Sequence, residues 1–286
     1  VTMGLAFEEY RRAFDLTPYP RPALVTSEEE KMERCDRILK FLLRERGMIA
    51  AFSSTYDRKR RVIREYMNTR NPLPVPPDIL ADQDALFWTE SVERGIVRTD
   101  DIPEIKYNIA HWQGDITRLD ADAVVNAGNT SLLGCFLPGH NCIDNVIHSA
   151  AGMQLRADCA KLISMQGHEE EIGDAKLTRA YNLPAKYVIH TVGPRVGREL
   201  TDEQRSQLRS SYYSILDLAA EAGCRNVAVC CVSTGVFNFP REEAAEIAAG
   251  AAVNWKLRHP ENKMKIVFDT FLDADAKVYE NILKMI

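Results

Sequence analysis

The stretch Gly134–Gly152, with the sequence GCFLPGHNCIDNVIHSAAG, gathers side chains that bind soft metal ions. Cys135, His140 and Cys142 fall within eight residues, in a loop that a Pro-Gly pair keeps out of regular structure. Two thiolates and one imidazole are ligands that zinc prefers, one short of a closed tetrahedral site. Because catalytic zinc keeps one position open, this spacing predicts a metal that touches substrate.

Packing is the competing interpretation of these residues. Cysteine is among the most buried residue types and often serves as a small hydrophobe. Three donors in one bent loop, with Asp144 two residues after Cys142, favour a metal over packing. Spacing alone does not separate zinc from another soft-ligand metal. For Asp144 two roles stay open: it orients the metal shell or acts as a general base, or it is a first-turn carboxylate favoured by the helix dipole.

Composition indicates an ordinary globular protein. The 286 residues are 45% hydrophobic and 27% charged, and no apolar run approaches the length of a membrane span. The N-terminus lacks the pattern of a secretory signal, and we expect no membrane partner. Seven cysteines, an odd and scattered set, favour a reducing setting, so we expect a cytoplasmic protein.

Charge is distributed unevenly along the chain. Residues 1–100 carry 17 basic and 17 acidic side chains, whereas residues 101–286 carry 19 and 24 and hold the whole net charge of -5. No basic stripe occurs, which argues against a nucleic-acid polymer as partner. A phosphate ligand in the acidic part would be bound mainly by backbone N–H groups and helix N-termini.

Residues 1–100 are predicted to form an arm and a helical extension. Residues 1–26 have no clear period and contain three prolines, which favours an irregular arm. Ser27 and Glu30 form a capping-box pattern that predicts a helix up to Gly47. Two more helices are expected over 56–67 and 77–95, on either side of the run NPLPVPP.

Residues 101–286 are predicted to form one α/β domain, because strand and helix patterns alternate there. Strands are expected over residues 105–111, 123–126, 187–192, 227–232 and 264–268. Helices are expected over residues 142–152, 201–222, 241–257 and 273–286. This order predicts a three-layer α/β/α sandwich with its ligand at the carboxyl ends of the strands.

Three loops follow predicted strands and carry polar groups. Gly114–Thr117 offers a lone carboxylate, Asp115, that can accept a hydrogen bond from the amino group of a base. Asn126–Asn129 leads into the loop that contains Cys135, His140 and Cys142. Ser233–Pro240 has small residues that let backbone amides approach a phosphate, just before a helix N-terminus. Considered alone, this third loop is explained equally well as a plain strand-to-helix turn.

Four motifs in order, WQGDIT, VVNAGN, GDAKLTRAYNLPAKYVIHTVGP and STGVFNFP, resemble those of macrodomains, the α/β modules that bind ADP-ribose. The resemblance covers roughly residues 104–286. Hydrolytic macrodomains have a glycine run where this chain has CFLPGHNC. That replacement, with the helical extension, resembles the zinc-dependent branch of microbial protein-ADP-ribosyl hydrolases. The branch has a further cysteine at the position of Gly139, and its absence from this chain leaves the three ligands intact.

The resemblance implies a role for each matching residue. Adenine is expected to bind Asp115 and the Ile116 backbone, and the distal ribose to bind Asn129. The loop expected to cradle the diphosphate comprises Ser233, Thr234, Gly235, Val236 and Phe237, the last near the distal ribose. The helix start expected to line the ADP-ribose site comprises Cys142, Ile143, Asp144 and Asn145. Phe271 is expected to pack against adenine or in the core. Three residues are expected to be structural, namely the hydrogen-bonded His148 and His190 and the backbone-bracing Asn126.

The function implied is zinc-dependent removal of mono-ADP-ribose from modified protein side chains, with release of ADP-ribose. Cys135, His140 and Cys142 would hold Zn²⁺ against the distal ribose, its open position facing a ribose hydroxyl or a water. Two thiolates offset the charge of the metal, so substrate fixation is expected to contribute as much as water activation. Zinc-type macrodomains often act opposite a sirtuin-like transferase on a lipoyl-carrier protein, which makes such a modified protein one expected partner.

Three alternatives stay open. A non-catalytic reader of ADP-ribosylated proteins would use the same pocket. A deacetylase of O-acetyl-ADP-ribose would use the same site on a small metabolite. A metal-stapled interaction domain, whose zinc only shapes a loop, would keep full activity after chelation.

Overall fold

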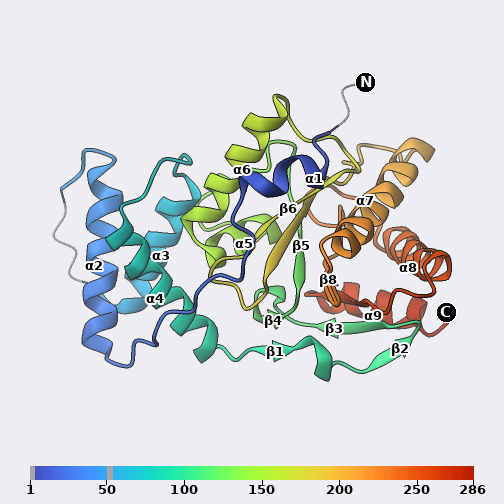
Figure 1. Ribbon diagram of the computed structural model, residues 1–286, viewed down its shortest axis with the longest axis horizontal. Helices are drawn as coiled ribbons and strands as arrows, with labels where there is room; N and C mark the ends of the chain where they lie inside the picture. The colour runs from blue at the N-terminus through green and yellow to red at the C-terminus, as the bar shows by residue number, and fades with distance from the viewer. Residues whose placement is uncertain (1–3, 50–53) are drawn as a thin grey trace.

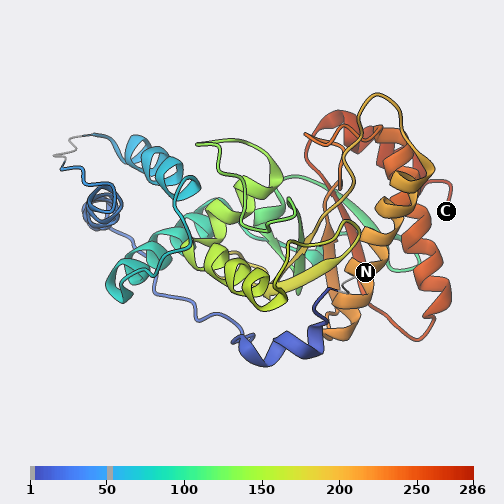
Figure 2. The same cartoon turned by 90° about the horizontal axis from the view of Figure 1, so that it is seen from above.

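The computed structural model describes residues 4–49 and 54–286. Figures 1 and 2 show a sheet with helices on both faces and a separate group of helices at one end. This arrangement confirms the predicted α/β sandwich with an N-terminal helical extension. Within the two described ranges, no helix is both long and apolar enough to cross a membrane.

The separate group consists of α2 (Glu28–Arg44), α3 (Tyr56–Asn68) and α4 (Pro77–Glu93). Its own core includes Ile38, Leu42, Ile63 and Leu86, and Met153 from the α/β domain joins it. The amphipathic stripes of the sequence therefore serve packing, as their spacing indicates.

The capping box predicted at the start of α2 is half-formed. The Ser27 hydroxyl accepts a hydrogen bond from the Glu30 N–H at 3.3 Å, as expected for an N-cap. The Glu30 carboxylate instead pairs with Arg34, one turn later, at 2.6 Å. An (i, i+4) ion pair on the helix surface thus replaces the second bond of the box.

The arm is irregular apart from α1 (Phe7–Tyr10) and a 3₁₀ turn (Arg11–Ala13), neither of which the sequence predicted; its first three residues lie outside the described ranges. Phe7 and Tyr10 belong to the main hydrophobic core. The Tyr10 hydroxyl accepts a hydrogen bond from the Leu177 N–H at 2.7 Å, and the Arg179 guanidinium donates to the Thr17 carbonyl at 2.8 Å. Because Leu177 and Arg179 lie on an edge strand, the arm covers that edge.

The main sheet has the strand order β2-β3-β9-β8-β5-β7-β6. The strands are β2 (Glu104–Lys106), β3 (Ile109–Gln113), β5 (Ala123–Ala127), β6 (Ala175–Arg179), β7 (Tyr187–Thr191), β8 (Asn226–Val229) and β9 (Lys265–Thr270). The central five are parallel, and β2 and β6 pair antiparallel at the two edges. A separate two-stranded pair joins β1 (Val97–Arg98) to β4 (Leu119–Asp120).

Helices cover both faces of this sheet. One face carries α5 (Ile143–Ala151) and α6 (Met153–Gln166), and the other carries α7 (Asp202–Glu221), α8 (Arg241–Arg258) and α9 (Asp273–Leu283) (Figures 1 and 2). A buried core of Val124, Val125, Ile189, Val227 and Val267 lies along the central strands. Fully buried parallel strands explain why these runs are apolar without alternation.

The single strand predicted over 105–111 is wrong. The chain forms a hairpin there, since β2 pairs antiparallel with β3 across Tyr107 and Asn108, whose φ angles are 56° and 58°. Two consecutive left-handed residues are the geometry of a type I′ turn, which asparagine tolerates. The pattern also missed β6 and the β1–β4 pair, and β8 ends at Val229, three residues before the predicted end.

Candidate functional site

The parallel strands bring the predicted loops to one edge of the sheet. Gly114 follows β3 and donates its N–H to the carbonyl of Thr270, at the end of β9, at 2.9 Å. Gly128 follows β5 and donates to the carbonyl of Thr191, at the end of β7, at 3.0 Å. The loops after β3, β5 and β8 therefore open on the same edge, where α/β sheets bind ligands.

The three predicted metal ligands come together in the loop before α5. The Cys135 Sγ lies 3.5 Å from the His140 Nδ1, and the donor atoms of Cys135, His140 and Cys142 lie within 4.8 Å of one another. All three side chains are half-buried. Burial raises the pKa of the Cys142 thiol to about 11, an effect that the nearby Cys135 increases.

The loop depends on two glycines and a helix start. Gly134 and Gly139 have φ angles of 84° and 64°, where a Cβ atom is strained. Cys142 is the N-cap of α5, and its sulfur accepts from the Asn145 N–H at 3.4 Å, so the predicted helix start is confirmed. The Asn145 amide donates to the Leu137 carbonyl at 2.9 Å and thereby ties the loop to the first turn.

The Asp144 carboxylate is buried beside the loop. Its Oδ1 accepts from the Asn126 Nδ2 at 2.8 Å and lies 3.5 Å from the His148 Nε2. Burial raises the pKa of Asp144 to about 6, although the Asn126 hydrogen bond lowers it. An ionisation near neutral pH suits proton transfer.

The predicted structural roles are only partly correct. His190 is hydrogen-bonded as predicted, to Asn126 through Nδ1 at 3.2 Å and to Thr178 through Nε2 at 2.9 Å. The prediction is wrong for His148, because neither of its ring nitrogens has a hydrogen-bond partner among the described residues. Asn126 links the Asp144 and His190 side chains, so the backbone-bracing role is wrong as well.

A second cluster of soft ligands lies in the core. The donor atoms of His148, Cys159 and His190 are also within 4.8 Å of one another, and all three residues are buried. The Asn126 amide donates to the His190 Nδ1, which leaves the proton of that ring on Nε2, facing Thr178. Because both nitrogens of His190 are engaged in this way, the cluster forms part of the core and offers no ready ligand set.

The loop after β3 places Asp115 at the start of a 3₁₀ turn (Ile116–Arg118). Its Oδ1 accepts from the Thr117 N–H at 2.9 Å and from the Thr117 hydroxyl at 2.7 Å. Its Oδ2 lies 3.2 Å from the Nη1 of Arg94, which follows α4. No sequence pattern indicates this role of Arg94, because the contact joins two separate regions of the chain.

The loop after β8 contains two strained residues. Ser233 and Asn238 have φ angles of 67° and 57°, a region that asparagine tolerates and serine adopts less readily. Asn238 thus takes the conformation that a glycine would adopt at this position. The Ser233 hydroxyl is buried and has no partner in the described chain. Strain with an unpartnered polar group is typical of a ligand site.

Phe271 follows β9 and is 71% exposed, so the hydrophobic-core role considered for it is wrong. The remaining interpretation, packing against adenine, stays a prediction.

Comparison with known proteins agrees with this geometry. The sequence profile of the Macro domain family matches residues 125–248. The chain is similar to a protein-ADP-ribose hydrolase of Treponema medium, with 41% identity over 257 residues, which cover 88% of this chain and 98% of the relative. The chain belongs to the macrodomain family.

Three other similar proteins cover between 64% and 87% of this chain. A protein-ADP-ribose hydrolase of Staphylococcus aureus is 42% identical over 254 residues, which cover 87% of this chain and 95% of that protein. The solved structure of a Trypanosoma brucei macrodomain in complex with ADP-ribose has a TM-score of 0.59 and 30% identity, and covers 76% of this chain and 94% of its own. An Oceanobacillus iheyensis macrodomain matches with a TM-score of 0.57 and 31% identity, covering 64% and 95% respectively.

The extension of this macrodomain contacts two of the loops described above. Arg94 reaches Asp115 in the loop after β3. Arg64 and Asn68 of α3 reach the loop of the predicted metal ligands, residues 134–142. Arg64 and Asn68 are four residues apart and share one face of α3. That spacing was visible in the sequence, but nothing in it indicated what the face contacts.

Proposed function

We propose that this macrodomain is a zinc-dependent hydrolase that removes mono-ADP-ribose from modified protein side chains and releases ADP-ribose. The observation that carries the proposal is the convergence of Cys135, His140 and Cys142 at the sheet edge where the other ligand loops open. The names of the curated relatives support hydrolysis of a protein-linked ADP-ribose.

One donor pair already has the spacing that tetrahedral zinc requires. Tetrahedral zinc with Zn–S and Zn–N bonds of about 2.3 and 2.05 Å separates its ligand atoms by about 3.4–3.8 Å. The Cys135 Sγ and His140 Nδ1 are 3.5 Å apart, so they match this geometry without rearrangement. A thiolate pair with one imidazole leaves a fourth position for an oxygen of substrate or water.

In this proposal the ligand extends along the sheet edge. The Asp115 carboxylate accepts a hydrogen bond from the amino group of adenine beside the Ile116 backbone, and Asn129 hydrogen-bonds the distal ribose. The N–H groups of Ser233–Phe237 cradle the diphosphate. Two features support a ligand role there: the strained backbone, and the buried Ser233 hydroxyl, which has no partner among the residues that the structure describes. The first turn of α5, from Cys142 through Ile143, Asp144 and Asn145, lines the distal ribose.

The bond broken joins the distal ribose to a protein side chain. Cys135, His140 and Cys142 would hold the metal, which when bound supplies a Lewis acid for an oxygen or a water of lowered pKa. Asp144 lies two residues after the last ligand, Cys142, and accepts a hydrogen bond from Asn126. It serves as the candidate general base or orients the metal shell. Fixation of the ribose by the surrounding side chains contributes orientation, which is worth several kcal/mol in such reactions.

The deciding experiment couples metal analysis of the purified protein to de-ADP-ribosylation of a mono-ADP-ribosylated protein, with and without chelator. We expect about one zinc per chain and loss of activity on chelation. His140→Ala and Cys142→Ala should lose zinc and activity, whereas His259→Ala, at the end of α8, should retain both. Full activity in the metal-free variants would exclude zinc catalysis.

The alternative functions predict other results. A reader module binds the modified protein without turnover, and an O-acetyl-ADP-ribose deacetylase hydrolyses that ester faster than the protein adduct. Full activity after chelation would favour an interaction domain whose zinc only shapes a loop.

The acceptor protein and the compartment are also part of this proposal. A lipoyl-carrier protein modified by a sirtuin-like transferase is the acceptor to test first. The seven free thiols, two of them proposed metal ligands, fit a reducing compartment such as the cytoplasm.

A further inference from the structure

The metal-ligand loop is held from outside the α/β domain. Helix α3 of the extension lies against the loop and the start of α5, and two of its side chains bond to the loop backbone. These contacts bridge 76 and 71 residues of sequence. A loop with two left-handed glycines is flexible by itself, so its geometry depends on such contacts.

Arg64 contacts the backbone of a proposed zinc ligand, His140. Its Nη2 donates to the His140 carbonyl at 2.7 Å and to the Asn145 Oδ1 at 3.0 Å. One guanidinium thus joins the backbone of the imidazole ligand to the first turn of α5. A planar group with fixed donors can hold two acceptors at once, which a lysine ammonium does with less geometric control.

Asn68, one turn later, closes a chain of hydrogen bonds around the loop. Its Oδ1 accepts from the Gly139 N–H at 2.9 Å, and its Nδ2 donates to the Ser149 hydroxyl at 3.0 Å. The Ser149 hydroxyl in turn donates to the Asn145 Oδ1 at 3.1 Å, and Asn145 donates to the Leu137 carbonyl. Gly139 and His140 are therefore both tied directly to α3.

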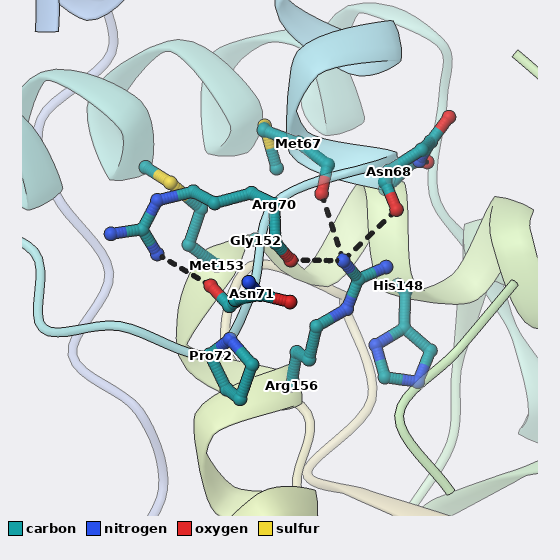
Figure 3. A pocket seen from close by; sticks show the side chains of 10 residues that line it. Met67, Asn68, Arg70, Asn71, Pro72, His148, Gly152, Met153 and Arg156 are labelled. Carbon is teal, nitrogen blue, oxygen red and sulfur yellow. Dashed lines mark hydrogen bonds between the residues drawn. The ribbon is translucent and has the colours of Figure 1, made fainter. Parts of the chain in front are cut away.

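The end of α3 is itself anchored to the α/β domain. The Arg156 Nη1 of α6 donates to the carbonyls of Met67, Asn68 and Arg70 (Figure 3). The same guanidinium stacks over the ring of Phe136, which follows the ligand Cys135, at 4.3 Å. Buried Arg156 thus fixes the position of α3 relative to the loop.

We propose that Arg64 and Asn68 of the helical extension are positioning residues for the Cys135, His140 and Cys142 site. The inference rests on the proposed function, because it assumes that the loop binds zinc. Partners that orient metal ligands typically contribute 10- to 100-fold to metal affinity. The extension is then part of the zinc site and not only an appended helical module.

The test measures zinc affinity of the full chain by competition with a chromophoric chelator. We expect Arg64→Gln to weaken zinc binding about 10- to 100-fold and Asn68→Ala about 10-fold. Arg61→Gln changes an exposed arginine of the same helix and should stay within about twofold of wild type. Asn68→Asp keeps the acceptor for the Gly139 N–H and should recover most of the affinity lost in Asn68→Ala.

Two further measurements separate positioning from folding. The melting temperature of each metal-free variant reports stability without the metal, and we expect Asn68→Ala and Asn68→Asp to differ little there. The absorption of Co²⁺ bound in place of zinc reports coordination geometry, and we expect it to change in Arg64→Gln but not in Arg61→Gln. If Arg64→Gln fails to fold, the zinc affinities of Asn68→Ala and Asn68→Asp still test whether α3 positions the zinc ligands.

The outcomes distinguish this inference from the proposed function. Absence of zinc binding in the wild type would overturn the proposed function together with this inference. Zinc binding by the wild type, with unchanged affinity and Co²⁺ spectrum in Arg64→Gln and Asn68→Ala, would overturn this inference alone.

Discussion

The Nη1 of Arg94 lies 3.2 Å from the Oδ2 of Asp115, so the end of α4 holds the carboxylate that follows β3. The Arg94 side chain is 43% exposed, and an exposed pair of this kind contributes under about 1 kcal/mol. Orientation of the carboxylate is therefore its main effect. Because Thr117 engages the other oxygen, Asp115 is held at both oxygens before any ligand binds.

This arrangement predicts unequal effects at the two positions. Asp115→Ala removes the proposed acceptor for the adenine amino group and should weaken ADP-ribose binding more than about 10-fold. Arg94→Gln removes only the orienting partner and should weaken it about 2- to 5-fold. Isothermal calorimetry with ADP-ribose measures both. Unchanged affinity in Asp115→Ala would show that the adenine end lies elsewhere.

Asn126 connects two buried side chains, Asp144 and His190, through one amide. Asn126→Leu leaves the Asp144 carboxylate without its donor and should lower the free energy of unfolding by about 2–3 kcal/mol. Asn254→Ala, on the exposed face of α8, is the matched control and should change stability by less than about 0.5 kcal/mol. Denaturant unfolding measures both, and a stable Asn126→Leu protein would contradict the assigned role.

Burial lowers the pKa of His190 to about 3 and that of His148 well below its usual range. In the unfolded chain each histidine takes up a proton near pH 6.5, whereas in the folded protein both stay neutral. The free energy of unfolding is therefore not reduced by these histidines above pH 6.5, and it falls as the pH is lowered below that value. Each loss approaches about 1.4 kcal/mol per pH unit below pH 6. Asp144, with its raised pKa, titrates with the opposite sign in this range.

The measurement is therefore a comparison between two chains. Unfolding free energies of wild type and His190→Gln, taken between pH 7 and 5, share the contributions of Asp144 and His148. The free energy of unfolding should fall more steeply for wild type than for the variant as the pH is lowered. The difference in unfolding free energy between the two chains should therefore narrow by about 1–2 kcal/mol from pH 7 to pH 5. Parallel curves would mean that His190 is not held neutral.

Sequence patterns correctly predicted features that depend on residues close together in the chain, such as helix starts. The N-cap at Cys142 and the starts of α2 and α8 follow from local capping chemistry and periodicity. The strand alternation over 105–111 misled, because alternation alone does not reveal the two left-handed residues that turn the chain at Tyr107. Propensity for a turn at Tyr107 is weak, so the sequence gives no clear signal of the hairpin between β2 and β3.

The ligand set and its supports differ in the same way. Cys135, His140 and Cys142 lie close together in sequence, so their convergence was predictable. Arg64 and Arg94 contact residues that are distant in the sequence. Their partners are the His140 carbonyl and the Asp115 carboxylate, which no pattern in α3 or α4 indicates. His148 was predicted to be hydrogen-bonded because of its motif position, but its ring nitrogens have no hydrogen-bond partner within residues 4–49 and 54–286.

Asn238 has a φ angle of 57° in the loop after β8. Asn238→Ala places a residue with no local polar compensation in this left-handed conformation and should lower stability by about 1 kcal/mol. Asn238→Gly removes the strain and should be neutral or stabilising by up to about 1 kcal/mol. Denaturant unfolding of the pair measures the difference; equal stabilities would show that the backbone conformation is not maintained in solution.

Tyr10 gives the arm a specific attachment to the edge strand β6. Its buried hydroxyl accepts the Leu177 N–H at 2.7 Å, a backbone donor at the edge of the sheet. Tyr10→Phe preserves the ring packing but leaves this donor without a partner, so it should lower the free energy of unfolding by about 1–3 kcal/mol. Tyr107→Phe, on the exposed hairpin turn, removes a hydroxyl without such a bond and should change stability by less than about 0.5 kcal/mol. Hydrogen exchange at the Leu177 amide provides a local measurement, and it should accelerate in Tyr10→Phe only. If exchange at this amide stays slow, the arm covers the edge through packing and not through this hydrogen bond.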